Sequence, residues 1–165
     1  EVDRMIRYYR QRATLAGTDQ YGALMHPYAI AQRIAQSLEK VHRDKSLQIS
    51  LLIPHTLECR ADEDDLYELF GNLLENAAKY AQQIIQVSYS NQTWRISDDG
   101  PGISADDIER VLQRGQRADE QRPGQGIGLA VAKAILEQYD GEIKILRSEL
   151  GGAEIQFSLP AAEIN

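Results

Sequence analysis

The chain has 165 residues, of which 42% are hydrophobic and 26% are charged, and this composition is ordinary for a globular domain. Its net charge of −7 argues against nonspecific binding of nucleic acid, which favours a basic face. The single cysteine excludes an internal disulfide, and no apolar run approaches the roughly 18 residues that a membrane span needs. We therefore expect a domain that works in a reducing compartment without a nucleic-acid partner.

The first residues are polar and rich in arginine, with a thin apolar stripe that is typical of the end of a helix. We expect residues 1–18 to be such a helix end with a linker, and residues 19–165 to form one domain. The chain opens in the middle of this helical pattern and does not begin with methionine. We therefore expect it to be part of a longer protein.

Hydrophobic periodicity and turn residues predict the elements that follow. They are a linker over 16–27, a helix over 28–45, strands over 47–53 and 57–60, a helix over 62–80, a hairpin over 84–98, a helix over 104–112, a mobile loop over 113–125, a helix over 126–139, and strands over 142–148 and 153–160. This order indicates an α+β two-layer sandwich. We expect a mixed, mostly antiparallel sheet that is covered on one face by three helices.

The helix over 62–80 has the clearest pattern, and it begins in an acidic stretch with a capping aspartate. At about 100° per residue, one broad face collects its apolar side chains. They are Leu66, Leu69, Phe70, Leu73, Leu74 and Ala77. Asn72, Asn76 and Lys79 fall in a separate arc, and asparagine is a mediocre helix former. This polar stripe is either a solvated face or a binding site.

The stretch "RISDDGPGIS" places two aspartates at the end of a strand, with two glycines after them. Because side chains alternate along a strand, Asp98 should point to the same face as Ile96. If that face is buried, the carboxylate needs a hydrogen-bond donor, which an exocyclic amino group could provide. The alternative is a tight turn that closes the sheet.

The stretch "RPGQGIGLAVAKAI" has three glycines at alternate positions, Gly124, Gly126 and Gly128, before an apolar helical run. A glycine-rich turn that opens a helix is a common phosphate-binding arrangement. The stretch is not a P-loop, because no Gly-Lys-Ser/Thr follows, and its spacing is not that of a dinucleotide fingerprint. By itself this motif indicates only a phosphate-bearing ligand.

The motifs together resemble the ATP-binding domain of histidine kinases, in the GHKL superfamily with the Bergerat fold. "NLLENAAKY" is similar to the N box of that family, "DDGPGI" to its G1 box, "GQGIGL" to its G2 box and "GGA" to its G3 box. Order and spacing agree over about 47–160. One departure is the phenylalanine-rich box before the lid loop, where this chain has Val111 and Leu112.

The resemblance implies ATP and Mg²⁺ as cofactors and gives each motif a role. Asp98 would accept a hydrogen bond from the adenine amino group, Tyr80 would cover the base or ribose, and Asn76 would ligate Mg²⁺. The G2 glycines would give the phosphate tail backbone N–H groups at a helix start. The complete set of expected cofactor-binding residues is Asn72, Asn76, Lys79, Tyr80, Asp98, Gly100, Gly102, Ile103, Arg117, Arg122, Gly124, Gln125, Gly126, Ile127, Gly128 and Leu129.

The resemblance also implies a kinase rather than a hydrolase. Hydrolysing relatives such as gyrase have a glutamate that activates water where this chain has Asn72, and an amide cannot act as a base. Glu75 could still assist a proton transfer, and Lys79, Arg117 and Arg122 would hold the phosphates. These five residues are the expected catalytic set, and the reaction is transfer of the γ-phosphate to a protein side chain.

The phosphate acceptor is expected outside this chain. His26, His42 and His55 do not lie in the acceptor pattern of the family, so each is expected to be an ordinary histidine. The resemblance implies an acceptor histidine on a separate dimerisation domain, whose last helix would end before Thr14. It also implies a response regulator as partner and a homodimeric, inner-membrane parent with this domain in the cytoplasm. The fragment alone is expected to be a monomer.

Two other functions remain open at this point. One is a GHKL kinase of the anti-sigma type, which would phosphorylate serine. The other is a noncatalytic module that binds nucleotide and acts through protein contacts.

Overall fold

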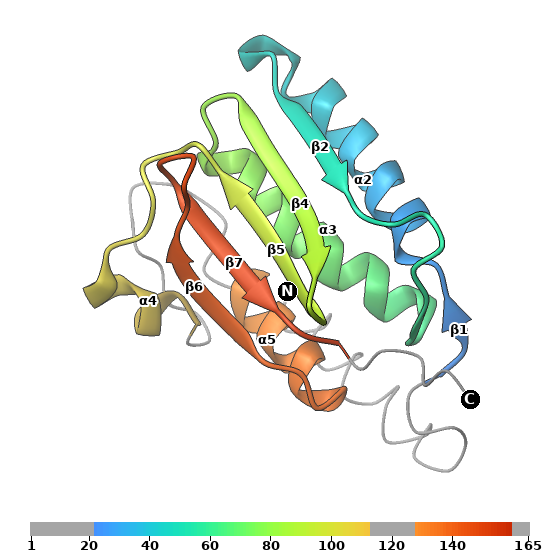
Figure 1. Ribbon diagram of the computed structural model, residues 1–165. Helices are drawn as coiled ribbons and strands as arrows, with labels where there is room; N and C mark the ends of the chain where they lie inside the picture. The colour runs from blue at the N-terminus through green and yellow to red at the C-terminus, as the bar shows by residue number, and fades with distance from the viewer. Residues whose placement is uncertain (1–21, 113–127, 160–165) are drawn as a thin grey trace, which may run out of the picture.

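The computed structural model describes residues 22–112 and 128–159, and Figure 1 shows its elements in space. They are β1 (Leu24–Met25), α2 (Pro27–Val41), the 3-10 turn η1 (Arg43–Lys45), β2 (Gln48–Leu52), β3 (Cys59–Arg60), α3 (Glu63–Tyr80), β4 (Ile84–Ser90), β5 (Thr93–Asp98), α4 (Ala105–Leu112), α5 (Gly128–Gln138), β6 (Ile143–Arg147) and β7 (Ala153–Phe157). The predicted lid loop and the predicted boundary near residue 18 lie outside the described residues. Within the described ranges, no helix combines the length and the apolar character that crossing a membrane requires.

Five strands form the main sheet in the order β2, β4, β5, β7, β6. β2 runs parallel to β4, and every other neighbouring pair in this sheet is antiparallel. Helices α2, α3 and α5 lie together behind one face of the sheet, whereas α4 contacts α5 and is not part of that layer (Figure 1). The predicted two-layer α+β sandwich is confirmed.

The amphipathic face of α3 packs against the centre of the sheet. Its apolar side chains from Leu66 to Ala77 are 0–1% exposed, as the helical spacing predicted. The ring of Phe70 lies edge-on to Trp94 of β5 and Phe157 of β7, with centroid distances of 5.1 and 5.8 Å. Burial of one large side chain of this kind contributes about 1.5–3 kcal/mol, so these contacts hold α3 firmly on the sheet.

Both ends of the first core helix differ from expectation. Leu24–Met25 was predicted as linker, but it pairs antiparallel with Cys59–Arg60 in a separate two-stranded sheet, a contact between segments distant in sequence. The helix predicted over 28–45 ends at Val41, and a 3-10 turn with Ser46 in the left-handed region (φ 53°) follows it. This turn brings the side chain of Lys45 toward α3.

Local hydrogen bonds and backbone conformation determine two features of the fold, the turn between β4 and β5 and the start of α3. Asn91 and Gln92 both have positive φ, 51° and 60°, as a tight two-residue hairpin requires, and the predicted hairpin is confirmed. At the start of α3, the side chain of Asp62 accepts hydrogen bonds from the backbone of Asp64 at 2.9 Å and Asp65 at 3.4 Å. The N-cap predicted from the acidic stretch is therefore present.

Candidate nucleotide-binding site

The polar stripe of α3 divides into one buried and two half-buried side chains. Asn76 is only 5% exposed, whereas Asn72 and Lys79 are half-buried. The side-chain amide of Asn76 makes no hydrogen bond within the described residues. No side-chain nitrogen or oxygen atom of these residues is both fully buried and unpaired. Among the residues that the structure describes, the amide of Asn76 therefore has no hydrogen-bond partner and is open to the surface. Because this amide is open to the surface and makes no such hydrogen bond, it is available to a ligand or an ion.

The neighbours of Asn76 on the helix are arranged differently. The amide nitrogen of Asn72 donates to the carbonyl of Glu68 at 2.7 Å, which fixes its orientation one turn earlier. Glu75 is exposed. The ammonium of Lys79 lies 5.4 Å from the ring centroid of Tyr80, within the range of a cation–π contact. Lys79 and Tyr80 thus form one edge of the candidate site.

Asp98 ends β5 as a buried carboxylate, 4% exposed, on the same face as Ile96. The backbone N–H groups of Gly100 and Ala153 donate to its Oδ1 atom at 2.9 and 3.3 Å. Oδ2 has no hydrogen-bond partner among the described residues. Burial raises the pKa of Asp98, and the two backbone donors oppose that rise. One oxygen is thus fixed by the protein and the other is available to a ligand donor.

The glycines around Asp98 are required by space. A Cβ atom on Gly100 would lie 2.2 Å from the carbonyl oxygen of Tyr80, and one on Gly152 would lie 2.0 Å from Oδ1 of Asp98. Gly102 has φ +79°, in the region that side chains disfavour. The end of α3, the loop after β5 and the turn before β7 therefore meet around one carboxylate. The sequence placed these motifs far apart, and the fold brings them together.

Other expected site residues are only partly described. Ile103 is half-buried and packs against the core, Gly128 begins α5, and Leu129 is 4% exposed. Leu112 also packs against the core, and the side chain of Val111 lies outside the description. Six expected ligand-binding residues lie outside the described residues altogether: Arg117, Arg122, Gly124, Gln125, Gly126 and Ile127.

Two contributors were missed from the sequence. Asp99 accepts hydrogen bonds from the backbone N–H groups of Gln82 and Gln83 at 2.8 and 3.0 Å, so it ties the loop after α3 to β5. Burial raises the pKa of Asp99, but these and other backbone donors outweigh it and hold the pKa below its usual value. Lys45 donates to the carbonyls of Ala78 and Ala81 at the end of α3. No local spacing signals either contact, because the partners are 16 to 36 residues away.

The three histidines occupy ordinary places. His26 lies 3.4 Å from a carboxylate oxygen of Glu58 at the surface, and His55 stacks on Tyr28 with a centroid distance of 3.9 Å. His42 is the residue at which α2 gives way to η1.

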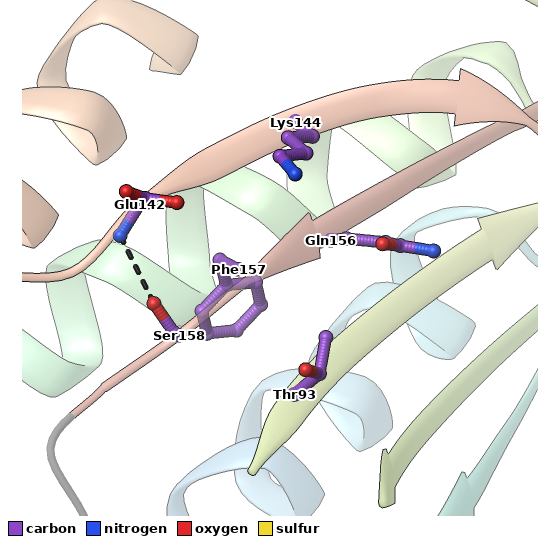
Figure 2. Close-up of a pocket in the computed structure, with 6 residues that line it drawn as sticks. All are labelled: Thr93, Glu142, Lys144, Gln156, Phe157 and Ser158. Carbon is purple, nitrogen blue, oxygen red and sulfur yellow. Dashed lines mark hydrogen bonds between the residues drawn. The ribbon is translucent and has the colours of Figure 1, made fainter. Parts of the chain in front are cut away.

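A polar hollow on the sheet lies away from the candidate site. Figure 2 shows its lining, with Thr93 at the start of β5 and the Glu142 N–H donating to the Ser158 hydroxyl at 3.0 Å. Asp98 lies at the opposite end of β5. The hollow shares no residue with the candidate nucleotide site.

Comparison with known proteins agrees with this arrangement. The chain is 38% identical over 161 residues to the sensor protein PhoQ of Escherichia coli K12, and 39% identical over 165 residues to the virulence sensor histidine kinase PhoQ of Salmonella typhimurium 14028s. Each match covers 94% of this chain and 33% of the relative, so the chain spans about a third of the length of these curated relatives. The solved structure of the mycobacterial sensor histidine kinase MprB has the same fold, with a TM-score of 0.75 at 21% identity, over 86% of this chain and 100% of that one.

Residues 61–163 match the family described as histidine kinase-, DNA gyrase B-, and HSP90-like ATPase. This range contains all of α3, the Asp98 loop and the Gly151–Gly152 turn. The chain therefore belongs to this family, and it corresponds to the ATP-binding domain of a two-component sensor histidine kinase.

Proposed function

We propose that this domain binds Mg-ATP through Asp98 and the polar stripe of α3, and that it donates the γ-phosphate to a histidine on another domain. The observation that carries the proposal is the state of Asp98, a buried carboxylate with one oxygen held by backbone and the other available. An adenine amino group is a suitable donor to that free oxygen. Guanine presents a carbonyl there, which would face the carboxylate unfavourably.

Magnesium fits the residues at this site. The amide oxygen of Asn76 is a hard, neutral ligand with no hydrogen-bond partner in the described part of the chain, and Mg²⁺ accepts such ligands when phosphate oxygens and water complete the octahedron. The described residues contain no group of three or more His, Cys, Asp or Glu that could hold a metal without help from the nucleotide. Bound Mg²⁺ would neutralise phosphate charge, while Asn76 and Lys79 orient the tail.

The catalytic roles of the remaining residues follow from their chemistry. Asn72 cannot act as a base toward water, so the site favours transfer over hydrolysis. Its amide nitrogen donates to the helix backbone, so its amide oxygen would make any supporting contact to the ligand. Glu75 would assist proton transfer, and Arg117, Arg122 and the glycines from Gly124 to Gly128 would bind the phosphates.

We infer the partners from the relatives. The phosphate acceptor would be a histidine on the dimerisation domain of a longer, homodimeric inner-membrane sensor, and the phosphate would pass from it to a response regulator. This domain would face the cytoplasm. Positioning supplies much of the barrier reduction in phosphoryl transfer, so the chain alone should bind ATP and turn it over very slowly.

Nucleotide binding is tested by calorimetric titration of ATP and GTP, each with Mg²⁺ and with EDTA. We expect preference for ATP, enhancement by Mg²⁺, and a loss of about 10–100-fold in affinity for Asp98→Asn, the size of one hydrogen bond to a charged group. Asp64→Asn is the matched control, because it removes the same charge from an exposed position at the far end of α3. Equal affinity of Asp98→Asn and the unchanged chain would refute the assigned role.

Phosphotransfer is tested with γ-labelled ATP and a separately produced dimerisation domain of the E. coli PhoQ relative. Acid-labile label on that domain is the expected product. Acid-stable phosphoserine would instead support a serine kinase, and binding without any transfer would support a noncatalytic module. Brisk labelling of the chain by itself would contradict the inferred absence of an acceptor.

A further inference from the structure

The side chain of Lys45 crosses from the turn between α2 and β2 to the end of α3. Its ammonium donates to the backbone carbonyl of Ala78 and, at 2.9 Å, to that of Ala81. The lysine is half-buried, unlike the exposed Lys40 one turn earlier. This contact therefore joins two elements that are more than 30 residues apart in the chain.

These carbonyls belong to the last turn of the helix that carries the polar stripe. The final carbonyls of a helix lack intrahelical partners and have a partial negative charge, which a lysine stabilises. Tyr80 lies between the two bonded residues. Its carbonyl is the atom that a Cβ on Gly100 would approach to 2.2 Å. The position of the last turn of α3 therefore determines how closely its backbone approaches the loop after Asp98.

The same segment is held from its other side. Asp99 accepts hydrogen bonds from the N–H groups of Gln82 and Gln83, and the N–H of Gln48 donates to the carbonyl of Gln83 at 2.8 Å. The chain from Ala78 to Gln83 therefore has a cation on its carbonyls and a carboxylate on its amides. A wall of a binding site must keep its geometry when the ligand leaves. Contacts to both the carbonyls and the amides of this segment would hold it in that geometry.

We propose that Lys45 is a positioning residue of the nucleotide site, which holds the end of α3 and Tyr80 in register with Gly100 and Asp98. This inference rests on the proposed function, because it names a further determinant of the same site. Lys45 does not contact the nucleotide in this account. It acts through the carbonyls of Ala78 and Ala81.

Electrostatics give Lys45 a second effect on the same carboxylate. Burial is the main influence on the pKa of Asp98 and raises it, the donors Gly100 and Ala153 lower it, the charge of Asp99 raises it, and the charge of Lys45 lowers it. Of these two charges, Asp99 has the larger effect on the pKa of Asp98 and Lys45 the smaller. Loss of Lys45 should therefore favour the protonated form of Asp98, which cannot accept the adenine hydrogen bond on its protonated oxygen.

The experiment compares Lys45→Met, Lys45→Arg and the matched control Lys40→Met in the full chain. ATP affinity is measured between pH 5 and pH 8, below the melting temperature of each variant. We expect Lys45→Met to bind ATP about 10-fold more weakly at neutral pH, because the end of α3 would no longer be held in place against Gly100 and Asp98, and loss of such a supporting contact typically costs about 10–100-fold. As the pH is lowered, ATP binding by Lys45→Met should be lost at a higher pH than ATP binding by the unchanged chain. Lys45→Arg should recover affinity to within a few-fold, and Lys40→Met should match the unchanged chain.

The pH midpoint, at which half of the ATP binding is lost on acidification, distinguishes a positioning role of Lys45 at the site from a merely structural role. The protonation of ATP itself is the same in every experiment, so a difference in the pH midpoint between variants reflects a change in the protein. If Lys45→Met only lowers the melting temperature and keeps both the affinity and the midpoint, the inference is wrong. Should Lys45→Met not fold, Lys45→Gln removes the charge, keeps an amide donor and carries the same two criteria.

The failures of the two proposals are distinguishable. Absence of ATP binding by the unchanged chain would overturn the proposed function and this inference together. ATP binding that depends on Asp98 but not on Lys45 would overturn only the role of Lys45.

Discussion

The backbone of Gly152 lies against the carboxylate of Asp98, so closely that a Cβ atom on this glycine would come within 2.0 Å of Oδ1. The N–H of Gly152 also donates to the backbone carbonyl of Asp98 at 3.1 Å. The turn before β7 is thus the support on which the Asp98 carboxylate rests. The first prediction follows from this contact, and the second concerns the charge of the same carboxylate.

The first concerns Gly152→Ala. The added methyl group must displace the Asp98 side chain or the turn, and overpacking of this kind costs about 1–3 kcal/mol. We expect a lower melting temperature and a loss of ATP affinity of at least about 10-fold, which corresponds to roughly 1.4 kcal/mol. Gly71→Ala is the matched control, because nothing lies within 4 Å of its added Cβ in the middle of α3. That variant should gain up to about 1 kcal/mol of stability. A Gly152→Ala protein with unchanged ATP affinity would contradict the close packing.

The second concerns the opposite pH dependences of stability and binding at Asp98. Its pKa is raised in the folded state, so its contribution to stability is present below the unfolded pKa and is lost as the pH rises through the folded pKa. The ionised form, which binds adenine, is therefore the less stable one. We expect Asp98→Asn to melt no lower than the unchanged chain at pH 7 while losing ATP affinity. Thermal melts at pH 5 and pH 7 check this, and a marked destabilisation of Asp98→Asn at pH 7 would count against it.

Asp99 should behave in the reverse way. Its pKa is lowered in the folded state, so its stabilisation is present above the unfolded pKa and is lost as the pH falls through the folded pKa. Asp99→Ala removes the acceptor for Gln82 and Gln83 and should cost about 1 kcal/mol at pH 7, as other lost caps do. Urea unfolding at pH 7 and at pH 3 measures the difference. The gap between Asp99→Ala and the unchanged chain should shrink at pH 3, and a constant gap would show that the carboxylate charge is not responsible.

Asn76 gives a prediction about the metal. Asn76→Ala removes from the stripe an amide that no other described residue binds, and it leaves the apolar face of α3 intact. We expect the enhancement of ATP binding by Mg²⁺ to fall several-fold, while affinity in EDTA stays nearly constant. Calorimetry with and without Mg²⁺ measures both values. An equal loss in the two conditions would mean that Asn76 contacts the nucleotide and does not serve the metal.

Much of the fold was predictable because its signals are local. The helical spacing of Leu66 to Ala77 predicted the buried face of α3, and the turn residues around Asn91 predicted the β4–β5 hairpin. The short pairing of Leu24–Met25 with Cys59–Arg60 was not predictable, because two-residue strands have no periodicity. The contacts of Lys45 and Asp99 were missed for a related reason. They bind backbone groups, and backbone groups leave no signature in the sequence.

The site itself was predicted from its motifs and from family resemblance. The pattern of alternation placed Asp98 on the same face as Ile96, and the structure shows that both are buried, at 4% and 1% exposure. The two donors to Oδ1 could not be foreseen, because Ala153 comes from a strand 55 residues away. Their presence changes the chemistry that a ligand meets. Within the described residues, Oδ2 is the oxygen of Asp98 that has no hydrogen-bond donor, so we expect a ligand donor to bind there.

The most direct measurement is a crystal structure of the chain with Mg²⁺ and a non-hydrolysable ATP analogue. We expect the adenine amino nitrogen within about 3.2 Å of Asp98 Oδ2, the usual limit for such a hydrogen bond, with the metal on the amide oxygen of Asn76. An adenine that lies elsewhere, or one that leaves Asp98 Oδ2 without a contact, would contradict the proposed role of Asp98.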